Sequence, residues 1–514
     1  MIAKLKQFRE TLYALFPKRR DAIMNLLDAL TSYGQHCHSV VELSQAACFE
    51  RQYSSITDAI ADGLTQVDWQ TVMKLIYKTT TPTTDNQINR FLIDCTCQPR
   101  PYAHKLADRT ITHAPNPAPG NKPICVGHQY SVITLLPETQ AERDKHWVIP
   151  LAAERVNSTQ KGNEVGMQQI IDYIDTLGLQ DQLSISIADS LYGTQTCRMT
   201  ASTQKNLIHL FRLNSKRNLF CPPKATGLLR GRKKEFGDKM ALSNPNTHPT
   251  CDEQAQTTWV SRRGKNYQVT IQCWRNMLIR GSRKFRSSQH PLNLLCIRVC
   301  DEQGNALFKR PLWLGVFGQR RDELDLIESY QNYTQRYDIE HFFRFGKQNL
   351  LMASYQTPDP IHEQQWWQLC LLAYNHLYLA NALVPLLPRP WERYLPEFQQ
   401  QEDKNLLLSP SHTQRGFSKV LEQVGSPAAL CVTRDKACGR VKGENGLKRD
   451  KHPIIFKTKK TSETKDKSIL SSSESTSISA NPQTIETLIN SVRSTIINLD
   501  ISPEKFAQML IDSG

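Results

Sequence analysis

The sequence predicts a mixed α/β fold built around one sheet. Apolar runs separated by Pro-, Gly- or Asn-rich turns indicate three consecutive strands, and a segment with apolar residues at helical spacing then precedes two more strands. The order β-β-β-α-β describes three antiparallel strands that continue into a parallel one. The expected strands cover residues 90–96, 129–138, 146–156, 182–189 and 206–214, and the expected helix covers residues 163–179.

The regions outside this α/β core have other patterns. Short segments with helical apolar spacing come first, and strand-like runs with basic loops predict a mainly β insertion inside the α/β domain. A basic region and a Ser/Thr-rich linker, expected to be disordered, precede the last helical segments. The expected domains are an N-terminal helical domain (1–82), the first part of the α/β domain (83–214), the β insertion (215–319), the second part of the α/β domain (320–390), a basic C-terminal extension (391–460), the linker (461–480) and C-terminal helices (481–514).

Length and charge limit the class of protein. A chain of 514 residues exceeds what one hydrophobic core usually holds, so two to four domains are expected. The net charge of +15 indicates a polyanionic partner, nucleic acid before membrane, although solubility alone could explain it. The fourteen cysteines show no C-x-x-C pair, which favours reduced thiols over zinc.

The sequence gives no sign of a membrane or export segment. The first residues lack an apolar core followed by a cleavage site, so no signal peptide is expected. The most apolar stretch, residues 366–388, contains Gln368, Asn375 and His376, which favours a buried helix of a soluble domain. A cytoplasmic protein without membrane contact is expected.

The stretch "YTQRYDIEHFFRFGK", residues 333–347, places one glutamate, Glu340, among aromatic and basic side chains. As a helix at about 100° per residue, it gathers polar groups on an arc of about 80° and turns its apolar residues to the other side. A surface helix with one ion pair from Glu340 to Arg336 or Arg344 is the simpler interpretation. The polar face holds Tyr333, Arg336, Glu340, Arg344 and Lys347, and the apolar face holds Ile339, Phe342 and Phe345.

Two aspartates strengthen a catalytic interpretation. Asp94 lies inside the apolar strand "FLIDCT", and Asp189 ends the strand "SISIAD", where α/β sites are usually built. Either could be explained singly, since an aspartate at a strand end often caps the next helix. Together with Glu340 they form an oxygen-only set that suits Mg²⁺ or Mn²⁺, because clustered carboxylates need protons or cations between them.

These motifs resemble the bacterial insertion-sequence transposases of the DDE type. The spacing Y-x2-R-x3-E-x6-K is met by Tyr333, Arg336, Glu340 and Lys347, and "FLIDCT" and "ADSLYG" match the contexts of the first two acids. The resemblance covers roughly residues 85–390 and implies a ribonuclease-H-like fold with Asp94, Asp189 and Glu340 as a catalytic triad holding two Mg²⁺ (or Mn²⁺) ions.

The resemblance also implies DNA contacts. The residues matching Tyr333, Arg336 and Lys347 contact phosphates near the cleaved end, and Arg344 lies on the same polar face. A tryptophan near the position of Trp313 stacks on a flipped base in similar transposases. A core tryptophan is the alternative for Trp313, and Trp259 and Trp274 are rival candidates.

The expected function is therefore DNA transposition. The enzyme would bind the terminal inverted repeats of its own element through the N-terminal helices, cut the ends, and join 3′-ends to target DNA as a dimer or larger assembly, associated with the nucleoid. One alternative is a metal-dependent nuclease of the same fold that does not join ends. A second is a transposase-derived DNA-binding protein without catalysis, against which the presence of all three acids argues.

Overall fold

The computed structural model describes residues 1–81, 87–113, 123–223, 234–261, 264–282, 285–385, 387, 391, 407–431, 443 and 448–456. The described residues belong to one compact unit that ends at Lys457. The expected linker at 461–480 and the expected helices at 481–514 lie outside the described residues, as does about half of the basic extension at 391–460.

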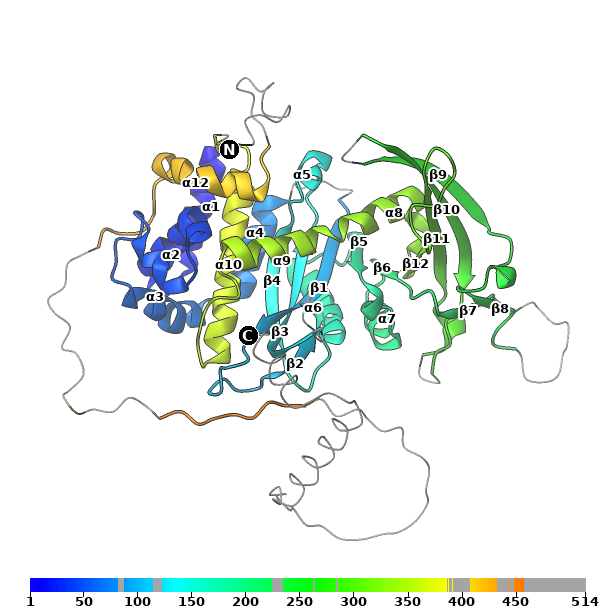
Figure 1. Ribbon diagram of the computed structural model, residues 1–514, viewed down its shortest axis with the longest axis horizontal. Helices are drawn as coiled ribbons and strands as arrows, with labels where there is room; N and C mark the ends of the chain where they lie inside the picture. Colours follow the sequence, from blue (N-terminus) through cyan, green and yellow to red (C-terminus); the bar gives the residue numbers. More distant parts are fainter. Residues whose placement is uncertain are drawn as a thin grey trace, which may run out of the picture. The chain divides into compact units, whose positions relative to one another are not determined.

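A mixed sheet forms the centre of the fold, which confirms the α/β class (Figure 1). β1 pairs antiparallel with β3, which pairs antiparallel with β4, while β1 and β5 are parallel and so are β5 and β6. The strand order β4-β3-β1-β5-β6 is the arrangement of a ribonuclease-H-like domain. These strands are β1 (Asn89–Pro99), β3 (Ile124–Leu135), β4 (Ile149–Val156), β5 (Ser184–Ala188) and β6 (Leu207–Arg212), with a short β2 (Thr110–His113) that pairs with β3.

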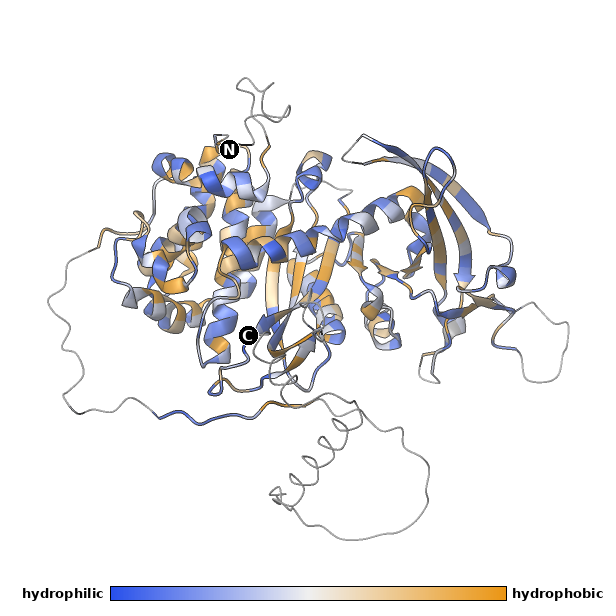
Figure 2. Cartoon of the chain, viewed as in Figure 1, coloured by the Kyte–Doolittle hydropathy of each residue, from blue (hydrophilic) through white to orange (hydrophobic). Residues whose placement is uncertain are grey.

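The strands of the insertion extend the same sheet. β12 pairs antiparallel with β6, and β11, β10 and β9 follow in order to the outer edge. Figure 2 shows apolar residues concentrated in the central strands and a more polar β9. The bounds are β9 (Glu253–Val260), β10 (Asn266–Met277), β11 (Leu292–Cys300) and β12 (Leu312–Phe317), and β7 (Asn218–Phe220) and β8 (Lys239–Ala241) form a separate two-stranded sheet.

Helices cover the sheet and form the N-terminal layer. α6 packs closely on β1, because a Cβ on Gly166 would lie 2.4 Å from Ile93 Cδ1. Ten of the fourteen residues of α2 are buried, and a buried Arg9–Asp28 ion pair of 2.6 Å joins it to α1. The bounds are α1 (Ile2–Leu15), α2 (Arg20–Tyr33), α3 (Ser54–Asp58), α4 (Trp69–Thr80), α5 (Gln140–Asp144), α6 (Gly162–Leu177), α7 (Gln195–Ala201), α8 (Leu326–Gln335), α9 (Asp338–Asn349), α10 (Pro360–Ala380) and α12 (Pro410–Val424).

The expected buried helix is α10. It starts at Pro360 after the cap Asp359, whose carboxylate accepts hydrogen bonds from two backbone amides, and every residue from Trp366 to Ala380 is buried. Among the described residues, no helix is both long enough and apolar enough to cross a membrane.

One buried carboxylate joins α10 to the sheet. Glu363 accepts hydrogen bonds from Arg100 Nε at 2.9 Å and the Tyr130 hydroxyl at 2.9 Å, and its other contact is His128 Nδ1 at 2.7 Å. Burial favours the neutral form of Glu363, but His128 and Arg100 outweigh it and lower the pKa of this carboxyl. The four side chains therefore hold α10 against β3 and the residue that follows β1.

The helix expected at 333–347 is interrupted. α8 ends at Gln335 and α9 begins at Asp338, so Arg336 and Tyr337 form a turn between two helices. The expectation of one continuous helix is therefore wrong, although Ile339, Phe342 and Phe345 do face the core.

Candidate active site

Three acids line one cavity of about 1370 Å³. Asp94 lies on β1 and Asp189 follows β5, and because Leu92 and Ile187 are register partners, the two aspartates lie two residues further along neighbouring parallel strands. Asp189 caps the next turn by accepting a hydrogen bond from the Leu191 amide at 2.8 Å. Glu340 reaches the cavity from the first turn of α9. The structure thus brings the three predicted acids to one cavity.

Arg336 neutralises part of this acid cluster. Its guanidinium donates to Glu340 Oε1 at 2.8 Å and to Asp94 Oδ2 at 3.4 Å, so it bridges an acid of the sheet and an acid of α9. Burial raises the pKa of Asp94 to about 7, Arg336 opposes the shift, and the charges of Asp189 and Glu340 add to it. A carboxylate in this position is stabilised by a nearby cation.

The acids suit a hard divalent cation. Two aspartates and one glutamate offer only oxygen donors, the set that Mg²⁺ and Mn²⁺ prefer. The oxygens of the three acids do not all lie within 4.8 Å of one another. Among the described residues, a different group of side chains meets that distance.

Lys347 and Arg344 line the same cavity from α9. Lys347 Nζ donates to Thr96 Oγ1 at 2.7 Å and to the Cys97 carbonyl at 2.9 Å, and Thr96 lies two residues after Asp94 on the same face of β1. Burial lowers the pKa of Lys347, and the nearby Cys97 and Cys125 oppose the shift. Lys347 therefore connects the helix of Glu340 to the strand of Asp94, while Arg344 is exposed.

The aromatic residues divide between the core and a second cavity. Trp313 is 1% exposed and packs edge-on against His248 at 5.4 Å and beside Trp274 at 5.9 Å. The expectation that Trp313 stacks on a DNA base disagrees with this burial, and the alternative of a core tryptophan fits it. Trp259, on the edge strand β9, is 41% exposed and lines a cavity of about 690 Å³ together with Tyr333.

Several basic residues of the site were missed from the sequence. They share positions at or just after the end of β6 or just before α6, where side chains reach the carboxyl ends of the parallel strands. Their positions at the end of "NLIHLFR", shortly after it and before "GNEVG" were the signal that could have found them. The missed cavity-lining residues are Lys161, Arg212, Lys216 and Arg217.

The ribonuclease-H-like sheet, with Asp94 on β1, Asp189 just after β5 and Glu340 on α9 lining one cavity, is the arrangement expected of a metal-dependent enzyme that acts on phosphodiester bonds. The family model of the DDE superfamily endonucleases matches residues 11–277, more than half of the chain, and the chain belongs to this family. A search among curated proteins found no match. The matched span includes Asp94 and Asp189 and ends before Glu340. The enzyme is therefore of the nuclease or transposase type, with DNA as substrate and a divalent metal requirement.

Proposed function

We propose that this endonuclease is an insertion-sequence transposase of the Y-R-E-K group. It binds the terminal inverted repeats of its own element, cleaves the ends, and joins the 3′-ends to target DNA. The observation that carries the proposal is the cavity in which Asp94, Asp189 and Glu340 lie beside the signature residue Lys347, with Arg336 bridging two of the acids.

The acids would hold two Mg²⁺ or Mn²⁺ ions. Such ions supply activation of the attacking oxygen and stabilisation of the leaving oxygen in an in-line displacement. The protein residues position the DNA. Arg336 offers a planar fork that grips a phosphate in two hydrogen bonds, which requires it to leave its bridge between Asp94 and Glu340. Lys347 and Arg344 contribute positive charge to the same cavity wall.

The second cavity is suited to the DNA end. It adjoins the first, since Arg212 and Tyr337 line both cavities. Its wall combines the exposed aromatic side chains of Trp259 and Phe308 with the basic side chains of Arg298, Lys309 and Arg310. Aromatic faces stack on unpaired bases and basic groups hold the backbone, so we assign the stacking role to Trp259 instead of Trp313.

The N-terminal helices remain the proposed reader of the end sequence. The burial of α2 means that it cannot enter a DNA groove without leaving the core. Exposed basic residues of the N-terminal helices, including Lys4 and Lys6 on α1 and Lys74 and Lys78 on α4, remain able to contact DNA. Pairing of two transposon ends requires at least a dimer during the reaction.

The test uses DNA carrying the terminal repeats of the element and Mg²⁺. Cleavage at the repeat ends, followed by joining of pre-cleaved 3′-ends to a plasmid, is the expected result. Cleavage without joining would identify a nuclease of the same fold, and binding without either reaction would identify a DNA-binding protein derived from a transposase.

A further inference from the structure

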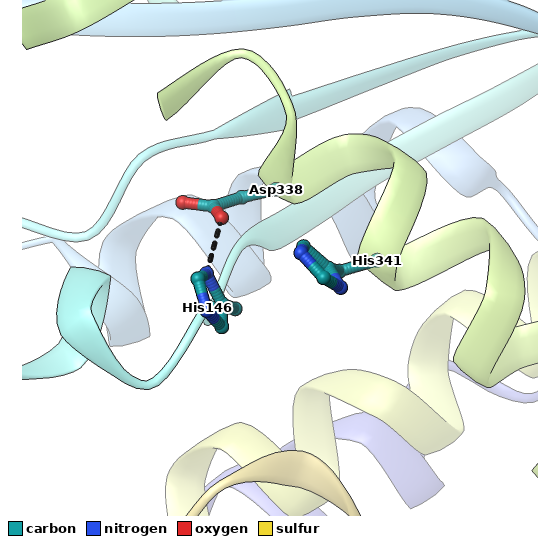
Figure 3. A group of neighbouring side chains, drawn as sticks. All are labelled: His146, Asp338 and His341. Atoms are coloured by element: carbon teal, nitrogen blue, oxygen red, sulfur yellow. Dashed lines mark hydrogen bonds and ion pairs between the residues drawn. The ribbon is translucent and has the colours of Figure 1, made fainter. Parts of the chain in front are cut away.

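A second group of metal-ligating side chains lies outside the acid cavity (Figure 3). It consists of His146, from the loop between α5 and β4, and Asp338 and His341, from the first turn of α9. One donor atom of each residue lies within 4.8 Å of the others. His146 Nδ1 is 2.7 Å from Asp338 Oδ1, and the two imidazole rings stack at 4.4 Å and 24°.

The spacing on α9 separates this group from the catalytic acids. Asp338 and His341 are three residues apart, so they lie on one face of the helix, about 60° from each other. Glu340 lies between them in sequence and points about 100° or more away from both. One turn of α9 thus serves the acid cavity on one side and the histidine group on another.

The donors favour a class of ion different from Mg²⁺. Two imidazole nitrogens and one carboxylate oxygen form the mixed set that Zn²⁺ and neighbouring transition metals prefer, and three protein ligands leave a position for water. Asp338 is nearly buried, with 6% of its side chain exposed, whereas the imidazole of His146 is 35% exposed and provides a path of entry. Ligand distances of about 2.0–2.2 Å require the three donors to approach a common centre when the metal binds.

We propose that His146, Asp338 and His341 form a site for a Zn²⁺-class transition metal that fastens the start of α9 to the loop before β4. A metal bound there joins two segments that are 192 residues apart in sequence. It thereby fixes the helix turn that presents Glu340. Metal binding to this site can be measured directly, so the proposal does not depend on the proposed transposition.

The test is metal binding to the full chain, purified without an oligohistidine tag and kept in excess Mg²⁺ so that the oxygen-only acids are saturated. Co²⁺ is the spectroscopic probe, and Zn²⁺ is titrated in competition. We expect one Co²⁺ per chain with the visible bands of a low-coordinate nitrogen and oxygen site and without sulfur charge transfer, displaced by Zn²⁺. His146→Gln and His341→Gln should each weaken Zn²⁺ binding at least 10-fold.

His362→Gln is the matched control. His362 lies three residues after Asp359 at the start of α10, with 3.8 Å between Nε2 and the carboxylate, so it repeats the Asp/His spacing without a second histidine in the group. This variant should bind Zn²⁺ as the wild type does. Absence of Co²⁺ bands in the wild type, or unchanged Zn²⁺ affinity in both His146→Gln and His341→Gln, would overturn the proposal. Circular dichroism of the metal-free variants checks that they fold, and if one does not, the other carries the comparison.

Discussion

At the scale of single residues, Arg336 determines how the acid cavity behaves. Its guanidinium lies against Asp94 and Glu340, and its positive charge takes the place beside these carboxylates that a bound metal ion would take. A metal ion therefore competes with Arg336 for the two carboxylates, and a DNA phosphate competes with the carboxylates for Arg336. The consequence is that Arg336 and Glu340 should respond to mutation in different ways, although they form an ion pair with each other.

Glu340→Gln preserves the shape of the side chain and removes the charge that a metal ligand needs. We expect metal-dependent DNA cleavage to fall by at least about 100-fold. Binding of end DNA should persist or become slightly tighter, because repulsion of phosphate falls. Gel-shift and cleavage assays on the same preparation measure both. If Glu340 were only a surface ion-pair partner, the variant would lose about 0.5 kcal/mol of stability at most and would cut DNA normally.

Arg336→Ala should strengthen metal binding while weakening DNA binding. The guanidinium no longer opposes a cation between Asp94 and Glu340, but the phosphate fork is lost. The measurement is Mn²⁺ titration at pH 8 and above, because Asp94 has a pKa of about 7 beside Arg336 and a higher pKa once Arg336 is removed. Arg344→Ala is the control, since the described residues include no ion pair from Arg344 to an acid: its DNA affinity should fall and its Mn²⁺ affinity should not change. Weaker Mn²⁺ binding in Arg336→Ala would contradict this account.

At the scale of elements, the strands of the sheet were predictable and the break between α8 and α9 was not. Runs such as "FLIDCT" and "SISIAD" became β1 and β5 because their apolar residues are needed on both faces of a covered sheet. The helical spacing of residues 333–347 continues through Arg336 and Tyr337, so periodicity alone could not reveal the turn between α8 and α9.

Only those residues of the candidate site that stand in a recognisable local sequence motif could be predicted. The three acids stand in recognisable local contexts, and they do line one cavity. The contacts of His146 with α9 and of Arg336 with β1 join residues far apart in the chain, and no local pattern announces them. Trp313 and Trp259 both lie in strand-like runs, and only the position of β9 at the sheet edge separates the exposed ring from the buried one.

The contact between α10 and the sheet depends on one carboxylate. Glu363→Gln leaves the charge of Arg100 buried without its partner, so we expect a loss of about 3–5 kcal/mol in the free energy of unfolding. Because the pKa of Glu363 is lowered on folding, its contribution is present above its ordinary pKa of 4.5 and is lost as the pH falls below that value. Urea unfolding at pH 7 measures the loss.

Glu328→Gln provides the comparison for that experiment. Glu328 pairs with Arg90 at 2.7 Å and is 29% exposed, so its substitution should remove about 1 kcal/mol or less. Equal losses from the two substitutions would show that Glu363 is not the clamp inferred from its contacts.

At the scale of the whole molecule, buried neutral histidines set the response to acid. Burial lowers the pKa of His209 to about 4 and that of His376 to about 3. Both imidazoles lie in the core, and His209 Nδ1 is 2.8 Å from Ser186 Oγ. The unfolded chain takes up protons below about pH 6.5, before the folded chain does, so stability falls as the pH drops from 6.5 to 4.

His209→Gln should make the free energy of unfolding depend less steeply on pH between 6.5 and 4. The 2.5-unit difference between 6.5 and 4 corresponds to about 3 kcal/mol of stability lost over that range, and the variant should lack this part. Denaturant unfolding at several pH values between 6.5 and 4 gives the slope. His104→Gln, which replaces an exposed histidine, should leave the slope as it is in the wild type. A wild-type slope in His209→Gln would mean that His209 is protonated in the folded protein.

The pairing of β6 with β12 also has a consequence for synthesis on the ribosome. Arg212 pairs with Leu314, so about 100 residues must be translated after β6 before its second neighbour exists. At roughly 5–20 residues per second, the apolar edge of β6 remains open for roughly 5–20 s. An open apolar edge invites pairing with other chains, so a chaperone that binds nascent chains at this stage should increase the yield of folded enzyme. A ribosome stalled after β6 has left the exit tunnel but before β12 is made should therefore carry a chain that is more prone to aggregate than one stalled well after β12 has emerged.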